Sequence, residues 1–281
     1  MTDVLLKDHL PARIAAYIDD ALREALDSLS DTVTDQDVHD ARKSLKKARG
    51  GLRLFRPTMT DETFREHNLV LRDAGRLLSP LRDSHSQLQL FHGLEDDTWL
   101  PSARIESVLY ADHSQARHAF DTTNARGICK EMIGQVRVAL GAAVLGDVET
   151  NIEGLCDIYR QGRRAFERVR KKDSSARRHE LRKQAKYLRL ALEVIDVPDY
   201  EHARDRARRI ASWLGEDHDL AVLHDRIKRN GSKSEAGDER WFRRIRDRQE
   251  RLQRKAFAKA EELFEEKPKE FVAKLRANDG H

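Results

Sequence analysis

The stretch HDARKSLKKARGGLRLF, residues 39–55, is repeated 140 positions later as HELRKQAKYLRLALEVI, residues 179–195. Six of the 17 aligned positions are identical, and five of these six carry polar or charged side chains. Two unrelated amphipathic helices would share apolar positions, but they would not need the same cations at the same places. The repeat therefore indicates a duplicated helical unit. The identical pairs are His39/His179, Arg42/Arg182, Lys43/Lys183, Lys46/Lys186, Arg49/Arg189 and Leu52/Leu192.

In each copy, the polar identities fall at positions i, i+3, i+4, i+7 and i+10. At about 100° per residue, these positions share one side of an α-helix. The opposite side carries small and apolar residues, among them Ala41 and Leu45 in the first copy and Leu181 and Ala185 in the second. Each helix is therefore predicted to bury one side and to present a row of cations about 15 Å long on the other.

Each row of cations is accompanied by a single acid, Asp40 or Glu180. Like charges one helical turn apart repel, so a surface helix normally interleaves acids with bases. The same imbalance extends over longer segments. Residues 1–38 contain three basic and nine acidic side chains, residues 39–56 seven and one, and residues 160–189 thirteen and three. This segregation predicts an anionic partner, and neutralisation by acids on neighbouring helices is the structural alternative.

The composition predicts an all-α protein. The chain has 281 residues, of which 36% are charged and only 6% aromatic, with 14 Gly and 6 Pro and a net charge of +4. So few turn-forming residues argue against a β-sandwich or barrel, and the length suits one domain over residues 1–281. Its repeated halves are expected at about 8–140 and 147–266. Periodicity predicts helices over 8–29, 37–55, 61–79, 82–93, 99–121, 128–145, 149–171, 176–195, 199–214, 218–229, 237–266 and 269–276.

Several classes of protein are excluded by simple features. The longest apolar run, Val138 to Leu145, has 8 residues, whereas a membrane-spanning helix needs about 20. The N-terminal sequence MTDVLLKDHL lacks the apolar core of a secretion signal. The two cysteines, Cys129 and Cys156, do not make a disulfide framework. A cytoplasmic protein is therefore expected.

A weaker correspondence follows each basic segment. LSPLRDSHSQL begins at Leu78, and LGEDHDLAVL begins at Leu214, an offset of 136. The aligned pairs are Leu78/Leu214, Asp83/Asp219, Arg82/His218 and, upstream, Arg72/Arg208.

The duplicated His-x-x-Arg-Lys-x-x-Lys-x-x-Arg helix, followed by an Arg-Asp or His-Asp segment, resembles the CHAD family (conserved histidine α-helical domain). The resemblance runs from about residue 8 to beyond residue 260. It implies two four-helix bundles related by a pseudo-twofold axis, with a basic groove at their junction. It also implies binding of inorganic polyphosphate and, as for bacterial members, association with polyphosphate granules. Some members carry a triphosphate tunnel domain, but its Glu-x-Glu-x-Lys motif is missing from this chain, which resembles the stand-alone form.

The resemblance also assigns residues. The first half departs from the family pattern at Ser79, where the family tends to have Gly, and at His85, where it tends to have a second Asp. The role of this segment is left open. The expected polyphosphate contacts are His39, Arg42, Lys43, Lys46, Arg49, His179, Arg182, Lys183, Lys186 and Arg189, with Arg53, Arg72, Arg82 and Arg208 as further candidates.

Other functions fit an all-α protein with basic helices. An HD-type metal-dependent phosphohydrolase would use His39–Asp40 and His218–Asp219. Cations beside His39 would repel a metal ion, however, and Asp40 becomes Glu180 in the repeat. A nucleic-acid-binding protein would use the same basic rows, but few aromatics are available for stacking. A purely structural adaptor is a further alternative. The sequence shows no nucleophile beside a base and no phosphate-binding loop, so we expect neither an enzyme nor a bound metal or cofactor.

Overall fold

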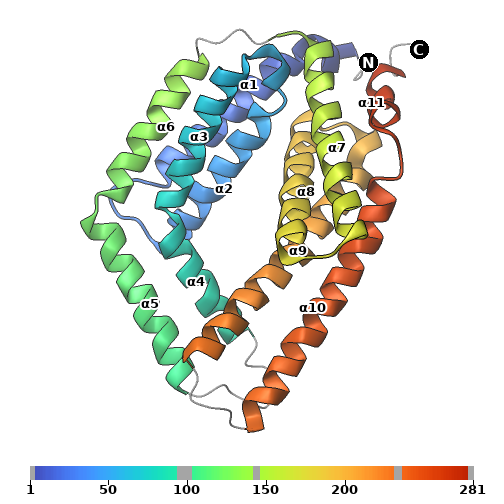
Figure 1. Cartoon of the computed structure of the whole chain (residues 1–281). Helices are drawn as coiled ribbons and strands as arrows, with labels where there is room; N and C mark the ends of the chain where they lie inside the picture. Colours follow the sequence, from blue (N-terminus) through green and yellow to red (C-terminus); the bar gives the residue numbers. More distant parts are fainter. Residues whose placement is uncertain (1–3, 94–102, 142–145, 231–235, 278–281) are drawn as a thin grey trace.

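The computed structural model describes residues 4–93, 103–141, 146–230 and 236–277. Within these ranges it contains eleven α-helices, two 3-10 turns and no strand (Figure 1). The all-α fold class is therefore confirmed. The elements are α1 (Val4–Asp27), α2 (Asp35–Leu52), η1 (Arg56–Thr58), α3 (Asp61–Leu77), α4 (Ser79–His92), α5 (Ala103–Thr122), α6 (Ala125–Gly141), α7 (Val148–Lys171), α8 (Ser175–Ile195), η2 (Pro198–Tyr200), α9 (Glu201–Asn230), α10 (Ala236–Leu263) and α11 (Pro268–Ala277).

The two basic helices, α2 and α8, have well-defined ends. A capping box opens α2: the Thr34 side chain accepts from the backbone N–H of Asp37, whose carboxylate accepts from the backbone N–H of Thr34. Ser174 caps the start of α8 with its side chain, and Asp196 at φ 45° ends it in the left-handed conformation. Such caps satisfy backbone groups that a helix leaves unpaired. They thereby fix where each helix begins and where α8 ends.

Two groups of helices face each other (Figure 1). One contains α1, α2, α3 and α6, and the other contains α7, α8, α9, α10 and α11. They meet where α2 and α1 pack against α8. From the first group, α4 and α5 extend as a pair toward α9, which both helices also contact. The basic helices are therefore neighbours in space although they are distant in the sequence.

Hydrophobic burial follows the predicted sides of the basic helices. Ala41, Leu45, Leu181 and Ala185 are at most 1% exposed and belong to the main core. A second core cluster lies where the α4–α5 pair meets α9 and α10, and it includes Leu88, Phe91, Ile105, Leu109, Leu220 and Leu223. Burying one side of α2 and α8 leaves their cations outside the core. None of the described helices contains a stretch long and apolar enough to cross a bilayer.

The helix break expected around Gly215 is wrong, because α9 runs without interruption from Glu201 to Asn230. Gly215 faces α8, and a Cβ added to it would lie 3.1 Å from Nε of Arg182. The glycine therefore makes room for a guanidinium group instead of ending the helix. At the aligned position of the first half, Ser79 and Pro80 do begin a new helix, α4.

The helices α2 and α8 approach each other most tightly at Gly50. A Cβ added to Gly50 would lie 2.8 Å from the Cβ of Leu190, which is 1% exposed. Real Cβ atoms do not come this close without a shift of the backbone or neighbouring side chains. Glycine at position 50 therefore sets the separation between the two helices that carry the cations.

We expect Gly50→Ala to lower the free energy of unfolding by about 1–3 kcal/mol, because the new methyl group overpacks the contact with Leu190. This result would run against helix propensity, which favours alanine over glycine by about 1 kcal/mol. Denaturant unfolding followed by circular dichroism measures the change.

Gly134→Ala in α6 is the matched control, since no atom lies within 4 Å of its added Cβ. This change should stabilise the protein by about 0.5–1 kcal/mol. Equal stabilisation at positions 50 and 134 would contradict the tight contact between α2 and α8.

Candidate anion-binding site

A cavity of about 940 Å³ lies between α2 and α8 and is also lined by α4, α5 and α9. We call it the α2–α8 cavity. It brings together side chains from both copies of the repeated basic helix, so the two rows of cations face a shared space. The sequence-predicted residues that line it are His39, Arg42, Lys43, Lys46, Arg82, His179, Arg182, Lys186 and Arg189.

Positive charge dominates the α2–α8 cavity. Eight arginine or lysine side chains line it, against three aspartates. Two of these aspartates form ion pairs within it: Asp83 Oδ1 lies 3.6 Å from Nη1 of Arg42, and Asp112 Oδ2 lies 2.6 Å from Nη2 of Arg226. The third is Asp219. Acids from neighbouring helices therefore reduce the positive charge of the cavity but do not cancel it.

Arg42 has buried donors that lack a hydrogen-bond partner. Among the residues that the structure describes, nothing accepts a hydrogen bond from its buried Nε and Nη1 atoms, and its side chain is only 14% exposed. Burial lowers the pKa of the guanidinium, and Arg82 lowers it further, while Asp83 opposes both effects. A buried cationic donor without a partner costs folding free energy of roughly 1–3 kcal/mol or more. An anionic acceptor in the cavity would remove this cost.

Lys46 lies deepest among like charges. Burial, followed by the repulsion of Lys186, Arg42 and Arg182, lowers the pKa of Lys46 to about 6. Burial, followed by the repulsion of Arg182, Arg189 and Arg42, lowers the pKa of Lys186 to about 8. Desolvation and nearby cations both disfavour the charged ammonium. At neutral pH the amine of Lys46 is therefore largely neutral. An anion that approached it would favour uptake of a proton.

The two histidines of the repeat share this electrostatic environment. Burial lowers the pKa of His39, and Arg82 lowers it further. Burial also lowers the pKa of His179, next to His218, whose ring lies 5.5 Å away. On α9, burial raises the pKa of Asp219. Burial therefore disfavours the charged forms of His39, His179 and Asp219.

Five of the predicted residues lie outside the lining of the α2–α8 cavity. Lys183 pairs with Glu180 at 2.5 Å, and Arg72 pairs with its neighbour Asp73 at 3.0 Å. Arg208 lines a smaller cavity of about 450 Å³, which shares Arg182, Lys186 and Arg189 with the first.

The other two, Arg49 and Arg53, are held by Tyr187 and Asn68. Nε of Arg49 donates to Asn68 Oδ1 at 3.1 Å, and the Arg53 guanidinium lies 3.7 Å from the centre of the Tyr187 ring. Burial lowers the pKa of Arg53 to about 10.

The structure adds lining residues that the sequence analysis did not single out. Asp112 and Gln115 come from α5, Gln87 from α4, and Arg226 from the last turns of α9. None of these residues belongs to the repeated pattern. Only the packing of the α4–α5 pair against α9 brings them to the cavity.

Elsewhere on α8, Arg178 pairs with two aspartates. Nε of Arg178 lies 3.1 Å from Oδ2 of Asp217, and its Nη1 lies 2.7 Å from Asp173. Asp217 is 4% exposed and also accepts from Gln249 and Gln253 of α10. This network fixes α8 against α9 and α10. In contrast, Arg182, one turn further along α8, forms no ion pair with a carboxylate in the described part of the chain.

We expect Lys46→Met to raise the free energy of unfolding by about 1–3 kcal/mol at pH 7, because an apolar side chain does not have to remain next to three cations. The folded pKa of Lys46 is about 6, against 10.5 for a free lysine. Between these values the unfolded chain binds a proton that the folded chain lacks, so the stability of the unmodified protein rises with pH. The gain from Lys46→Met should therefore shrink from about pH 6 to about pH 9.

Lys43→Met, at an exposed position of the same helix, serves as the control and should show no such gain. Thermal unfolding over a pH series measures both variants. An equal gain for the two variants, or a gain that does not change with pH, would contradict the proposed environment of Lys46.

Comparison with known proteins identifies the family of this chain. Residues 14–228 match the CHAD domain family. PptA from Streptomyces chartreusis has a similar structure, with a TM-score of 0.62 at 13% sequence identity, over 91% of this chain and 97% of that one. The CHAD domain from the plant Ricinus communis gives a TM-score of 0.54 at 15% identity, over 96% and 91% of the two chains. No curated protein sequence matches significantly. The two structures share the fold, and the family match covers most of the sequence, so this chain belongs to the CHAD domain family.

Proposed function

We propose that this chain binds inorganic polyphosphate in the α2–α8 cavity. The observation that carries the proposal is the buried guanidinium of Arg42, whose Nε and Nη1 atoms have no hydrogen-bond partner in the described ranges of the chain. It lies beside Lys46 and across from Arg182 and Lys186, and Arg42 and Arg182 both disfavour the charge of Lys46. A cavity lined by eight arginine and lysine side chains against three aspartates is suited to an anion with many charges.

Polyphosphate matches the chemistry of this lining. Arginine can fork two phosphate oxygens, whereas lysine offers a compact point charge. Binding of a polyanion would relieve the repulsion between the two rows of cations and release counterions. No phenylalanine, tyrosine or tryptophan is among the described lining residues. Stacking of bases therefore has no support here, which favours polyphosphate over single-stranded nucleic acid.

The hydrolase alternative receives less support from this cavity. Asp40, the neighbour of His39, accepts a hydrogen bond from Gln36 at 2.9 Å and does not line the cavity. In the described part of the chain, neither His39–Asp40 nor His218–Asp219 belongs to a group of three converging metal ligands. We therefore propose that the chain is a binding protein rather than an enzyme.

The proposal extends to the organisation and location of the protein. The order α7, α8, α9 and α10 in the second half parallels α1, α2, the pair α3–α4 and the pair α5–α6 in the first. The two halves, about 8–140 and 147–266, would then be pseudo-twofold copies that each contribute one wall of a basic groove. A polyphosphate-binding protein of this kind would gather at cytoplasmic polyphosphate granules.

We expect Arg42→Ala combined with Arg182→Ala to weaken binding of long-chain polyphosphate by at least tenfold, because two forked phosphate contacts are lost from opposite walls. Isothermal titration calorimetry measures the affinity. Repeating the titration over a salt series gives the number of phosphate charges engaged, from the slope of log K against log salt. The helical circular dichroism should be retained, since neither side chain belongs to the core.

Arg65→Ala combined with Arg254→Ala removes the same charge from exposed positions outside the cavity. This control should keep the affinity of the unmodified protein. If both double variants bound equally well, polyphosphate would bind somewhere other than the α2–α8 cavity.

We expect the affinity for polyphosphate to rise at least about tenfold from about pH 8 to about pH 5.5. The pKa of Lys46 is about 6, and burial lowers the pKa values of His39 and His179. A bound anion raises all three, so the protonated protein binds more tightly and binding takes up protons. Calorimetry in buffers of different ionisation enthalpy counts these protons. Long chains keep the charge of the ligand nearly constant over this range.

The combined variant Lys46→Met, His39→Asn and His179→Asn should bind with a flatter pH profile and a smaller proton uptake. A flat profile in the unmodified protein would contradict the assignment of these groups to the binding site.

A further inference from the structure

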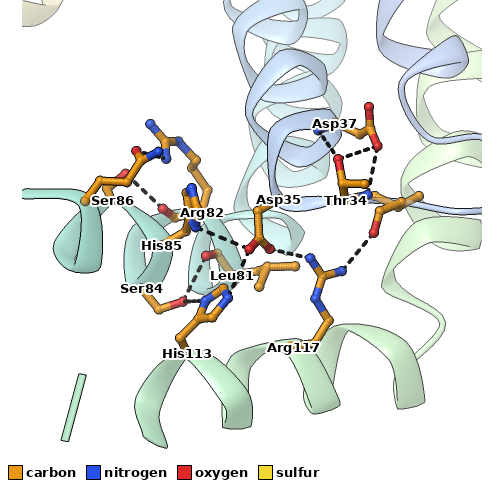
Figure 2. Close-up of polar contacts among 12 residues, drawn as sticks. Thr34, Asp35, Asp37, Leu81, Arg82, Ser84, His85, Ser86, His113 and Arg117 are labelled. Atoms are coloured by element: carbon orange, nitrogen blue, oxygen red, sulfur yellow. Dashed lines mark hydrogen bonds and ion pairs between the residues drawn. The ribbon is translucent and has the colours of Figure 1, made fainter. Parts of the chain in front are cut away.

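A second group of polar side chains lies next to the α2–α8 cavity but outside its lining. Asp35 is the first residue of α2, His85 belongs to α4, and His113 belongs to α5. Figure 2 shows the two imidazole rings converging on one carboxylate oxygen of Asp35, while the other oxygen of this carboxylate contacts Arg117. In the described part of the chain, this is the group of three whose donor atoms could hold a metal ion.

The distances between the donor atoms of these three side chains suit a shared metal ion. Nδ1 of His85 lies 3.2 Å, and Nε2 of His113 lies 3.0 Å, from the same oxygen, Oδ2 of Asp35. The three donor atoms lie within 4.8 Å of one another. At a tetrahedral metal centre with bonds of about 2.0–2.2 Å, neighbouring ligand atoms are separated by roughly 3.2–3.6 Å. Small side-chain rotations would therefore bring all three atoms to bonding distance of one ion.

The hydrogen bonds around His113 fix how its ring is oriented. The hydroxyl of Ser84 donates to the carbonyl oxygen of Leu81 at 2.9 Å, so it can only accept from Nδ1–H of His113, at 3.1 Å. In the neutral ring, Nε2 then carries a lone pair directed at Oδ2 of Asp35. Two lone pairs in contact need a positive centre between them. Protons on the two imidazoles could each satisfy one contact to this oxygen, whereas a single metal ion would join both imidazoles and the carboxylate at one centre.

The surrounding groups hold the three ligands in place. Ser84 orients His113 in the manner typical of residues that support metal-bound imidazoles. Arg117 contacts Oδ1 of Asp35 and donates to the carbonyl oxygen of Val33 at 3.0 Å. It thereby leaves Oδ2 for the two histidines. The side chains of the three ligands are 19–25% exposed, so an ion can enter from solvent.

We propose that Asp35, His85 and His113 form a binding site for a divalent transition-metal ion, and that Zn²⁺ is the ion their donor set fits best. Two imidazoles and one carboxylate are typical zinc ligands, and three protein ligands leave a fourth position for water. The site would tie the start of α2 to α4 and α5. It stands apart from the proposed polyphosphate site, since none of the three ligands lines the α2–α8 cavity.

The test uses the full chain without a polyhistidine tag, freed of metal with a chelator. Titration with ZnCl₂ against a chromogenic chelator should give one tight site per chain, and Co²⁺ should produce the visible absorption of a tetrahedral centre. Zn²⁺ should also raise the midpoint of thermal unfolding, because it binds the folded chain. His85→Ala combined with His113→Ala should weaken Zn²⁺ binding at least 100-fold. Ser84→Ala, which removes only the support of His113, should weaken it about tenfold.

The matched control, His118→Ala combined with His202→Ala, removes two exposed histidines and should bind Zn²⁺ like the unmodified protein. Circular dichroism verifies that each variant is folded. The proposal is overturned if the unmodified chain binds no Zn²⁺, or if the His85/His113 variant binds Zn²⁺ as tightly as the unmodified chain. Neither result depends on polyphosphate binding, which is measured separately.

Discussion

The close packing of α2 against α8 is the interaction on which the rest of the structure depends. Each helix buries small and apolar residues on one side, and Gly50 lets the two backbones approach until Leu190 fills the contact. This approach brings the cations of both helices into one partly desolvated space. The lowered pKa of Lys46 and the unpartnered donors of Arg42 are direct consequences. The hydrophobic core stabilises an arrangement that electrostatics alone would drive apart.

The distribution of acids explains why the positive charge survives folding. The chain has almost as many acids as bases, but many of its acids pair away from the cavity. Asp217 holds Arg178, and Glu24 accepts from Lys47 and Ser44 on the far side of α2. These pairs hold α2 and α8 against neighbouring helices, so the acids that form them are not available to the cations of the cavity. The cations that face the α2–α8 cavity are therefore left with few carboxylate partners among the described residues.

The two halves differ most in the pair α4–α5. Where α9 continues through Gly215, the first half begins a new helix at Ser79 and Pro80. Ser79 closes this junction by donating to the carbonyl oxygen of Gly75. The new helix carries His85 to the end of α2, where Asp35 and His113 meet it. At the offsets of the repeat, Asp35 aligns with Ser175 and His85 aligns with Ala221, so the second copy lacks these polar ligands.

The sequence alone determined the all-α fold and the two basic helices, because burial of one helix side and exposure of the other follow from a period of 3.6 residues. It also identified most of the cations that line the cavity, since a duplicated pattern of charged residues is not needed for helix formation. It could not determine which cations remain without partners. Lys183 and Lys186 look alike in the repeat, yet one pairs with Glu180 and the other faces the cavity. Nor could it place Arg226, or bring Asp35, His85 and His113 together. Those outcomes depend on how helices distant in sequence pack, and only the tertiary structure fixes the distances on which pairing and desolvation depend.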